Sequence, residues 1–190
     1  MKPYKVYALI GKSASGKDTI VQELLKKTNN IFHGVVSHTT RPKRDYEIDK
    51  KDYYFVTEEE ISKLCEEDKM LEISCFNNWL YGTCIESFDK EKINLGVFNL
   101  QGICSLLERE DIDLRVFYVQ ASDKIRLMRQ LSREENPNIE EIIRRYKTDN
   151  LDFKDYNINF LFTAIENNNS EDFENCLATV IAFSEEDYLV

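Results

Sequence analysis

A glycine-rich segment directly after an apolar run is the feature that most narrows what this chain can fold into. The segment GKSASGKDT covers residues 11–19, and the run before it, YKVYALI, covers residues 4–10. Gly11, Gly16 and Lys17 have the spacing of a phosphate-binding loop, in which backbone N–H groups and a helix N-terminus hold phosphate. We therefore expect a nucleotide site between a buried strand and a helix over DTIVQELLKKT.

The loop departs from the usual pattern at Asp18, where a Ser or Thr that ligates magnesium is typical. The chain is therefore either a working phosphotransferase or a binding module that kept only the shape of the loop. Asp18 can bind magnesium or one of its waters, or it can serve only as a favourable acidic residue in the first helical turn. The residues alone leave both interpretations open.

Composition excludes several other classes of protein. With 190 residues, 42% hydrophobic and 12% aromatic, the chain is long enough for one folded domain. Its net charge of −10 disfavours a nucleic-acid partner, although a local basic pocket can still hold a small anion. The five cysteines are scattered and never form CxxC, which argues against disulfides and a zinc site. The first apolar run is too short for a membrane span and has no signal pattern, so we expect a cytoplasmic protein.

Apolar runs alternate with helical patterns along the rest of the chain. GVFNL (96–100), DLRVFYV (113–119) and NINFLF (157–162) indicate further buried strands, each followed by a helical stretch. This alternation predicts an α/β fold with a P-loop NTPase core, in which helices flank a parallel sheet. The predicted core comprises residues 1–34, 89–121 and 153–190.

Two segments break this alternation. Residues 35–88 contain the short strands DYYFV and WLYGT around one helix, which a capping box of Thr57 and Glu60 opens. We predict that they form a small α+β subdomain inserted into the core. Residues 122–152 are helical, rich in arginine and interrupted at ENPN, which predicts a helical lid. No repeat or flexible linker separates these parts, so residues 1–190 are expected to be a single domain.

The segment SHTTRPKRDYEIDKKDYYF, residues 37–55, carries a second anion-binding pattern. Arg41 and Arg44 flank Pro42, which favours an extended backbone, and two guanidinium groups there can converge on one phosphate. Tyr53 can add a hydroxyl to the same phosphate. A solvated surface loop is the alternative, because charged residues are mostly exposed.

Together these motifs resemble the guanylate kinase family over nearly the whole chain. The resemblance implies transfer of the γ-phosphoryl group of ATP to GMP or dGMP with Mg²⁺. It assigns ATP to the loop residues Gly11, Ser13, Ala14, Ser15, Gly16, Lys17, Asp18 and Thr19. It assigns the nucleoside monophosphate to Ser37, Arg41, Arg44, Tyr53, Glu72, Tyr81 and Thr83. Chemistry agrees with the role of Glu72, because one carboxylate can accept from both donors on the Watson–Crick edge of guanine.

The segment RQLSREENPNIEEIIRR resembles the lid of this family. Arg133 and Arg144 match its arginines, and with Lys17 they are the predicted catalytic residues, supplying positive charge to the migrating phosphoryl group. We expect Arg129 and Arg145 to lie on a solvated helix face in Glu–Arg pairs. For Arg126 both roles remain open.

NLQG, residues 99–102, matches a family turn that reads Asp-x-Gln-Gly, so Asn99 replaces an acid near the metal. We hypothesise that one carboxylate has moved from the strand end to the helix start, which makes Asp18 and Asn99 the predicted metal site. The alternatives are an inactive nucleotide-binding or protein-interaction module and a kinase for another phosphorylated acceptor. The expected partners are small molecules, without nucleic acid or membrane, and the protein is expected to be a monomer or homodimer.

Overall fold

The computed structural model describes residues 2–28, 30–45, 47–76, 78–133, 135–155 and 162–188. Its main sheet has five strands in the order β2-β7-β1-β8-β9. The pairs β2–β7 and β8–β9 are parallel, with Phe32 opposite Ile93 and Phe117 opposite Thr163. The predicted α/β class is therefore confirmed. The strands are β1 (Tyr4–Ile10), β2 (Phe32–Gly34), β7 (Ile93–Val97), β8 (Ile112–Gln120) and β9 (Thr163–Glu166).

β1 lies in the middle of the main sheet, with β7 on one side and β8 on the other. Its residues 6–10 are all buried. A central parallel strand is covered on both faces, and it therefore reads as a continuous apolar run rather than an alternating one. The strand predicted at residues 4–10 is confirmed with both ends correct.

Internal packing divides the chain into two compact units, and the division falls within β1 and β8. The first unit comprises residues 1–8 and 30–115. It contains a second sheet in the order β4-β3-β6-β5, in which β5 and β6 form an antiparallel hairpin. Its elements are β3 (His38–Thr39), β4 (Tyr54–Phe55), α2 (Glu58–Glu66), β5 (Met70–Phe76), β6 (Trp79–Cys84), the 3₁₀ helix η1 (Ile85–Ser87) and α3 (Leu100–Leu107).

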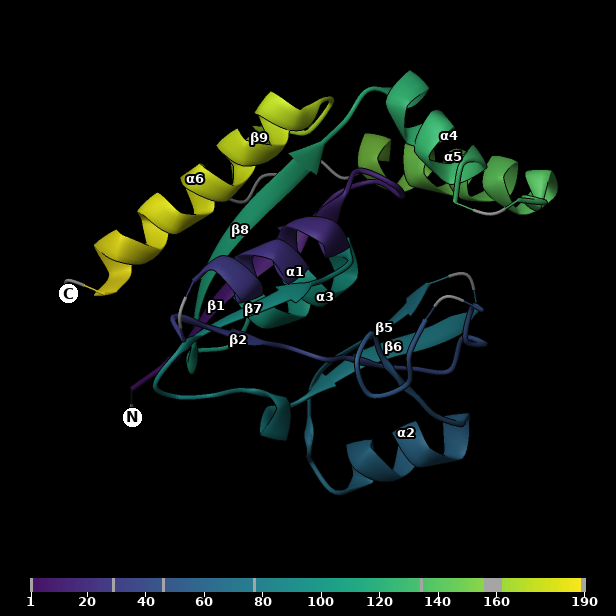
Figure 1. Ribbon diagram of the computed structural model, residues 1–190. Helices are drawn as coiled ribbons and strands as arrows, with labels where there is room; N and C mark the ends of the chain where they lie inside the picture. Colours follow the sequence, from purple (N-terminus) through teal and green to yellow (C-terminus); the bar gives the residue numbers. More distant parts are fainter. Residues whose placement is uncertain are drawn as a thin grey trace. The chain divides into compact units, whose positions relative to one another are not determined.

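The second unit comprises residues 9–29 and 116–190. Its helices are α1 (Lys17–Lys27), α4 (Asp123–Leu131), α5 (Ile139–Asp155) and α6 (Ser170–Tyr188). Figure 1 shows α6 lying along β8 and β9, and α4 packed beside α5. The two helices expected in the predicted lid are present, and the break between them falls at ENPN. In the part of the chain that the structure describes, no helix has the length and apolar character needed to cross a membrane.

The boundaries predicted for the strand near residue 96 are wrong. The strand expected at residues 96–100 is β7, which lies three residues earlier at Ile93–Val97. Asn99 instead caps α3, with its Oδ1 accepting from the Gly102 N–H at 2.8 Å. Of the strand expected at NINFLF, residues 157–161 lie outside the described residues, and β9 follows at Thr163–Glu166.

The capping box at the start of α2 is confirmed in full. The Thr57 hydroxyl accepts from the Glu60 N–H at 3.2 Å, and Glu60 Oε2 accepts from the Thr57 N–H at 2.8 Å. Two N–H groups that a helix start leaves without partners are thereby satisfied.

Replacing Thr57 with alanine should lower the free energy of unfolding by about 1 kcal/mol, because one side of the capping box is lost. Urea denaturation measures this loss. Ser62→Ala is the matched control, since it removes another exposed hydroxyl of α2 that bonds only to a helix carbonyl, Glu58 O. An equal loss in both variants would contradict the assignment to the cap.

Candidate functional site

Two glycines give the phosphate loop its shape. Gly11 has φ 149° and Gly16, which caps α1, has φ 100°, a region that other residues rarely adopt. These positions also have no room for a side chain. A Cβ on Gly11 would collide with the carbonyl of Val119, and one on Gly16 would collide with the amide of Asn167. Both positions therefore need glycine, as the loop motif predicts.

The backbone carbonyls from Gly11 to Gly16 all have donors. Lys17 Nζ donates to the carbonyls of Gly11 and Lys12 at 2.6 and 3.1 Å, and the Ile20 N–H donates to that of Gly16. The other side-chain donors are Arg126 Nε to Ser13 O, Arg129 Nη1 to Ala14 O and Ser15 O, and Asn167 Nδ2 to Ser15 O. A loop that presents N–H groups to an anion needs partners for its carbonyls, and here cationic side chains supply many of them.

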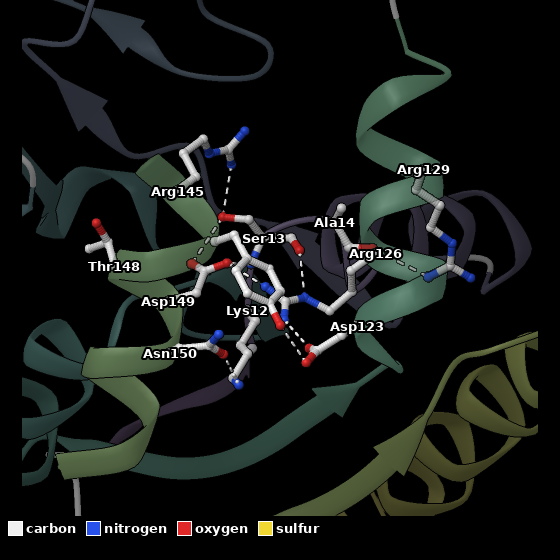
Figure 2. A network of polar contacts seen from close by, with 12 residues as sticks. Lys12, Ser13, Ala14, Asp123, Arg126, Arg129, Arg145, Thr148, Asp149 and Asn150 are labelled. Carbon is white, nitrogen blue, oxygen red and sulfur yellow. Dashed lines mark hydrogen bonds and ion pairs between the residues drawn. The ribbon is translucent and has the colours of Figure 1, made fainter. Parts of the chain in front are cut away.

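Ser13 is bound by residues of both α4 and α5 (Figure 2). Its N–H donates to Asp149 Oδ2 at 2.8 Å and its hydroxyl to Asp149 Oδ1 at 3.0 Å. Arg126 Nη2 in turn lies 2.6 Å from Asp149 Oδ2. Sequence reasoning missed Asp149, because more than a hundred residues separate it from the loop that it contacts.

Lys17 and Asp18 lie in the first turn of α1. Burial lowers the pKa of the Lys17 ammonium, while the nearby carboxylates of Asp18 and Asp149 oppose this shift. Asp18 and Thr19 are exposed. An exposed carboxylate beside the loop lysine is chemically suited to a hard cation such as Mg²⁺. Within the described ranges, this position included, no group of three or more His, Cys, Asp or Glu side chains could hold a metal.

The arginines of α4 and α5 that contact the phosphate loop are not the ones that we expected. Arg129 and Arg145 were expected to face solvent, and this was wrong. Arg129 donates to the loop carbonyls, and Arg145 Nη2 donates to Ser13 Oγ at 3.0 Å. Arg144 instead pairs with Glu141 three residues earlier, at 2.6 Å, and Arg133 is exposed. The catalytic roles of Arg133 and Arg144 stay predictions.

In the first unit, Arg41 and Arg44 converge on one anionic group, as their spacing suggests, but this group is the carboxylate of Glu47. Arg41 donates to Glu47 Oε2 and Oε1 at 3.0 and 2.7 Å, and the Arg44 N–H donates to Oε2 at 2.8 Å. Burial alone would lower the pKa of Arg41, but the hydrogen bond and charge of Glu47 outweigh burial and raise it. Sequence reasoning missed Glu47, although a carboxylate three residues after Arg44 was a visible signal.

Two tyrosines stand beside this arginine. The Arg41 guanidinium lies over the Tyr53 ring at 5.5 Å, and the Tyr53 and Tyr81 rings meet edge to face with centroids 6.1 Å apart. Aromatic faces favour such a cation. The structure thus brings together Arg41, Arg44, Tyr53 and Tyr81, four of the residues predicted to hold the acceptor phosphate.

The other predicted acceptor residues form a chain of hydrogen bonds. Glu72 on β5 and Thr83 on β6 are cross-strand neighbours, and Thr83 Oγ1 donates to Glu72 Oε1 at 2.7 Å. Ser37 Oγ lies 2.9 Å from Thr83 Oγ1. Glu72 is 6% exposed, and burial raises the pKa of its carboxyl to about 7, against a smaller lowering by Thr83. A Cβ on Gly102 of α3 would stand 2.9 Å from Glu72 Oε2, so glycine leaves room for this carboxylate.

Both polar atoms of the Asn99 side chain have partners within the first unit. Its Oδ1 caps α3, and its Nδ2 donates to Ser74 Oγ at 2.7 Å. Aspartate would also cap a helix. A carboxylate could not donate to Ser74, however, and this bond is what the amide adds. The predicted metal role of Asn99 stays a prediction.

A phosphate loop between β1 and α1 of a parallel sheet defines a P-loop nucleotide-binding protein. Comparison with known proteins narrows this class. A sequence profile of guanylate kinase matches residues 3–184. Guanylate kinase from Wigglesworthia glossinidia brevipalpis is 32% identical over 165 residues, 82% of this chain and 79% of that protein. This chain belongs to the guanylate kinase family.

Two further comparisons give the extent of the likeness. Guanylate kinase from Thermotoga maritima is 44% identical over 92 residues, which are 48% of this chain and 44% of that protein. The match thus spans less than half the length of that relative. The crystal structure of guanylate kinase from Anaplasma phagocytophilum has a TM-score of 0.67 and 24% identity, covering 96% of this chain and 88% of that one. This likeness shows a shared fold.

The Glu72→Gln variant should become more stable than the wild type as pH rises. The pKa of Glu72 in the folded protein, about 7, lies above its ordinary value of 4.5. The contribution of this group to the free energy of unfolding is therefore fully present below pH 4.5 and is lost as the pH rises to 7. Glutamine carries no such cost, and its advantage should reach roughly 3 kcal/mol above pH 7. Urea denaturation at pH 5 and pH 8 measures it. A difference that does not change with pH, or that Glu66→Gln at an exposed position of α2 reproduces, would contradict this assignment.

Proposed function

We propose that this protein transfers the γ-phosphoryl group of ATP to GMP or dGMP, giving ADP and GDP or dGDP. The observation that carries the proposal is the phosphate loop, whose carbonyls are all engaged while Lys17 and Arg145 bring positive charge to it. Phosphoryl transfer needs positioned charge rather than covalent help from the protein. The guanylate kinase relatives support the same reaction class.

We assign guanine as the base of the acceptor nucleotide because of Glu72. Its buried carboxylate, held by Thr83, offers acceptor oxygens to the two adjacent donors of the guanine edge. Adenine presents an acceptor at the position of one of these donors, so it would leave a buried carboxylate unsatisfied, and this rejects it strongly. Arg41, Arg44, Tyr53 and Tyr81 would bind the monophosphate, with Ser37 beside them. Neither Glu72 nor Thr83 separates GMP from dGMP.

Mg²⁺ is the cofactor implied by this reaction, and it would neutralise charge on the donor phosphates. Mg²⁺ in such kinases needs only one or two carboxylates in addition to phosphate oxygens. Asp18, an exposed carboxylate in the first turn of α1, fits this need. Asn99 fits less well, because its side-chain oxygen already caps α3.

For the transfer step, Lys17 is assigned to the terminal phosphates of ATP, with Ser13 to Gly16 and Thr19 around it. Of the adjacent pair in α5, Arg145 is the better supported catalytic arginine because it bonds to Ser13, whereas Arg144 pairs with Glu141. Arg144 and the exposed Arg133 remain candidates for contacts made only when nucleotide is bound.

A coupled ADP-release assay with ATP and Mg²⁺ tests the reaction. We expect ADP with GMP or dGMP and far less with AMP or without an acceptor. Lys17→Ala should reduce turnover by about a hundredfold or more, because it removes charge stabilisation of the transferred group. No ADP from the wild type, with GMP still bound in calorimetry, would contradict the proposal and indicate a guanine-nucleotide-binding module.

Exchanging residues at the proposed metal site tests where the carboxylate acts. Asp18→Ser should weaken turnover and raise the Mg²⁺ concentration needed for half-maximal rate, because serine keeps an oxygen at this position but removes the negative charge of the carboxylate. Adding Asn99→Asp should restore both quantities in part. Aspartate still caps α3, so the rescue reports the charge and not the fold of the helix.

Asn99→Asp alone is the control for this double-mutant cycle. A rescue requires the effect of Asn99→Asp to depend on residue 18. If the two losses simply add, the carboxylate has not moved from one position to the other.

A further inference from the structure

Each polar group of Ser13 is bonded to a side chain of α4 or α5. Its N–H and hydroxyl donate to Asp149 at 2.8 and 3.0 Å. Its carbonyl accepts from Arg126 Nε at 3.0 Å, and its hydroxyl oxygen also accepts from Arg145. Figure 2 shows Ser13 between Asp149 on one side and Arg126 on the other. One loop residue thus fixes two helices that are far away in the sequence.

The ion pair at this point is buried. Arg126 is fully buried and Asp149 is 5% exposed. The three guanidinium nitrogens of Arg126 have three different acceptors, which are Ser13 O, Asp123 Oδ1 and Asp149 Oδ2. Only the planar fork of arginine can serve three acceptors in fixed directions, and a lysine at this position could not. The pair therefore allows one arrangement of α4, α5 and the loop.

This arrangement also places Arg145. Asp149 lies four residues after Arg145 on α5, so both side chains lie on the same face of the helix. Holding Asp149 against Ser13 therefore holds Arg145 at the loop. Burial lowers the pKa of Lys17, and the charge of Arg145 adds to this lowering, which shows that it is within electrostatic reach of the ammonium.

From this geometry we propose that Arg126 and Asp149 are positioning residues. Their buried ion pair, called the latch below, holds α4 and α5 against Ser13 and so sets the position of Arg145 for phosphoryl transfer. The inference rests on the proposed function, because it concerns the same phosphate loop. The competing interpretation is that Asp149 occupies the place of a phosphate and must leave when ATP binds. We assign Asp149 the positioning role, since its partners Ser13 and Arg126 are themselves hydrogen-bonded to each other.

Kinetics of Asp149→Asn test the latch, with Glu140→Gln as the matched control. Glu140 is an exposed carboxylate of the same helix, so its variant makes the same change in charge without touching Ser13. We expect Asp149→Asn to lower kcat by about a hundredfold, the effect of misplacing a charge by about 1 Å, and to change the KM for ATP far less. A lower Kd for ATP would overturn the proposal and favour the competing interpretation. An unchanged kcat would also overturn it.

A double variant separates positioning from stability. Asp149→Leu leaves the buried Arg126 with the exposed carboxylate of Asp123 as its remaining ion-pair partner among the described contacts, which is destabilising, whereas replacing both buried charges by apolar residues restores much of the stability. Arg126→Met with Asp149→Leu should therefore recover most of the Tm that Asp149→Leu loses, while kcat stays low. If kcat returns together with Tm, the pair is merely structural and the proposal is wrong.

Hydrogen exchange keeps this test apart from the test of the proposed function. If the wild type forms no ADP from ATP and GMP, the proposed function has failed, and exchange in the free protein then decides on the latch. Amides of α4 and α5 should exchange faster in Asp149→Asn than in Glu140→Gln. Equal exchange in the two variants would overturn the latch.

Discussion

The phosphate loop has to direct its N–H groups toward an anion, and this constraint shapes the second unit of the structure. Most carbonyls that point away from the anion have no partner in a helix or a strand, so side chains reach them. Arg126, Arg129 and Asn167 do so from α4 and from the segment after β9, while Lys17 does so from the first turn of α1. The loop therefore depends on residues more than a hundred positions away. Lys17 and Arg129 also add positive potential where phosphate would bind.

Local signals predicted the parts of the structure that local interactions build. The buried run of β1 and the capping box at Thr57 both depend on neighbours within a few residues, and both are confirmed. The strand expected at residues 96–100 is wrong, because Leu100 begins a helix although it continues the apolar run of the strand. An N-cap residue before Leu100 was the signal that α3 begins there.

The long-range partners of the loop could not be predicted in the same way. A Glu–Arg pair three residues apart on a helix looks the same whether the arginine faces solvent or the loop. Arg144 and Arg145 are adjacent, and only the packing of α5 decides that Arg145 reaches Ser13. Asp149 belongs to none of the motifs found in the sequence. By contrast, the resemblance to guanylate kinases identified Glu72 and Thr83, which the register of β5 and β6 then brings together.

Both units contain the same kind of interaction, an arginine held in place by a buried carboxylate. Arg41 is held by Glu47 in the first unit, and Arg126 is held by Asp149 in the second. Each pair is nearly neutral, so it fixes geometry and adds little attraction for phosphate. The attraction must come from cations that the pairs hold in place, which are Arg44 beside Glu47 and Lys17 and Arg145 beside Asp149. In a chain of net charge −10, this division lets a few oriented cations bind polyanionic nucleotides against the overall field.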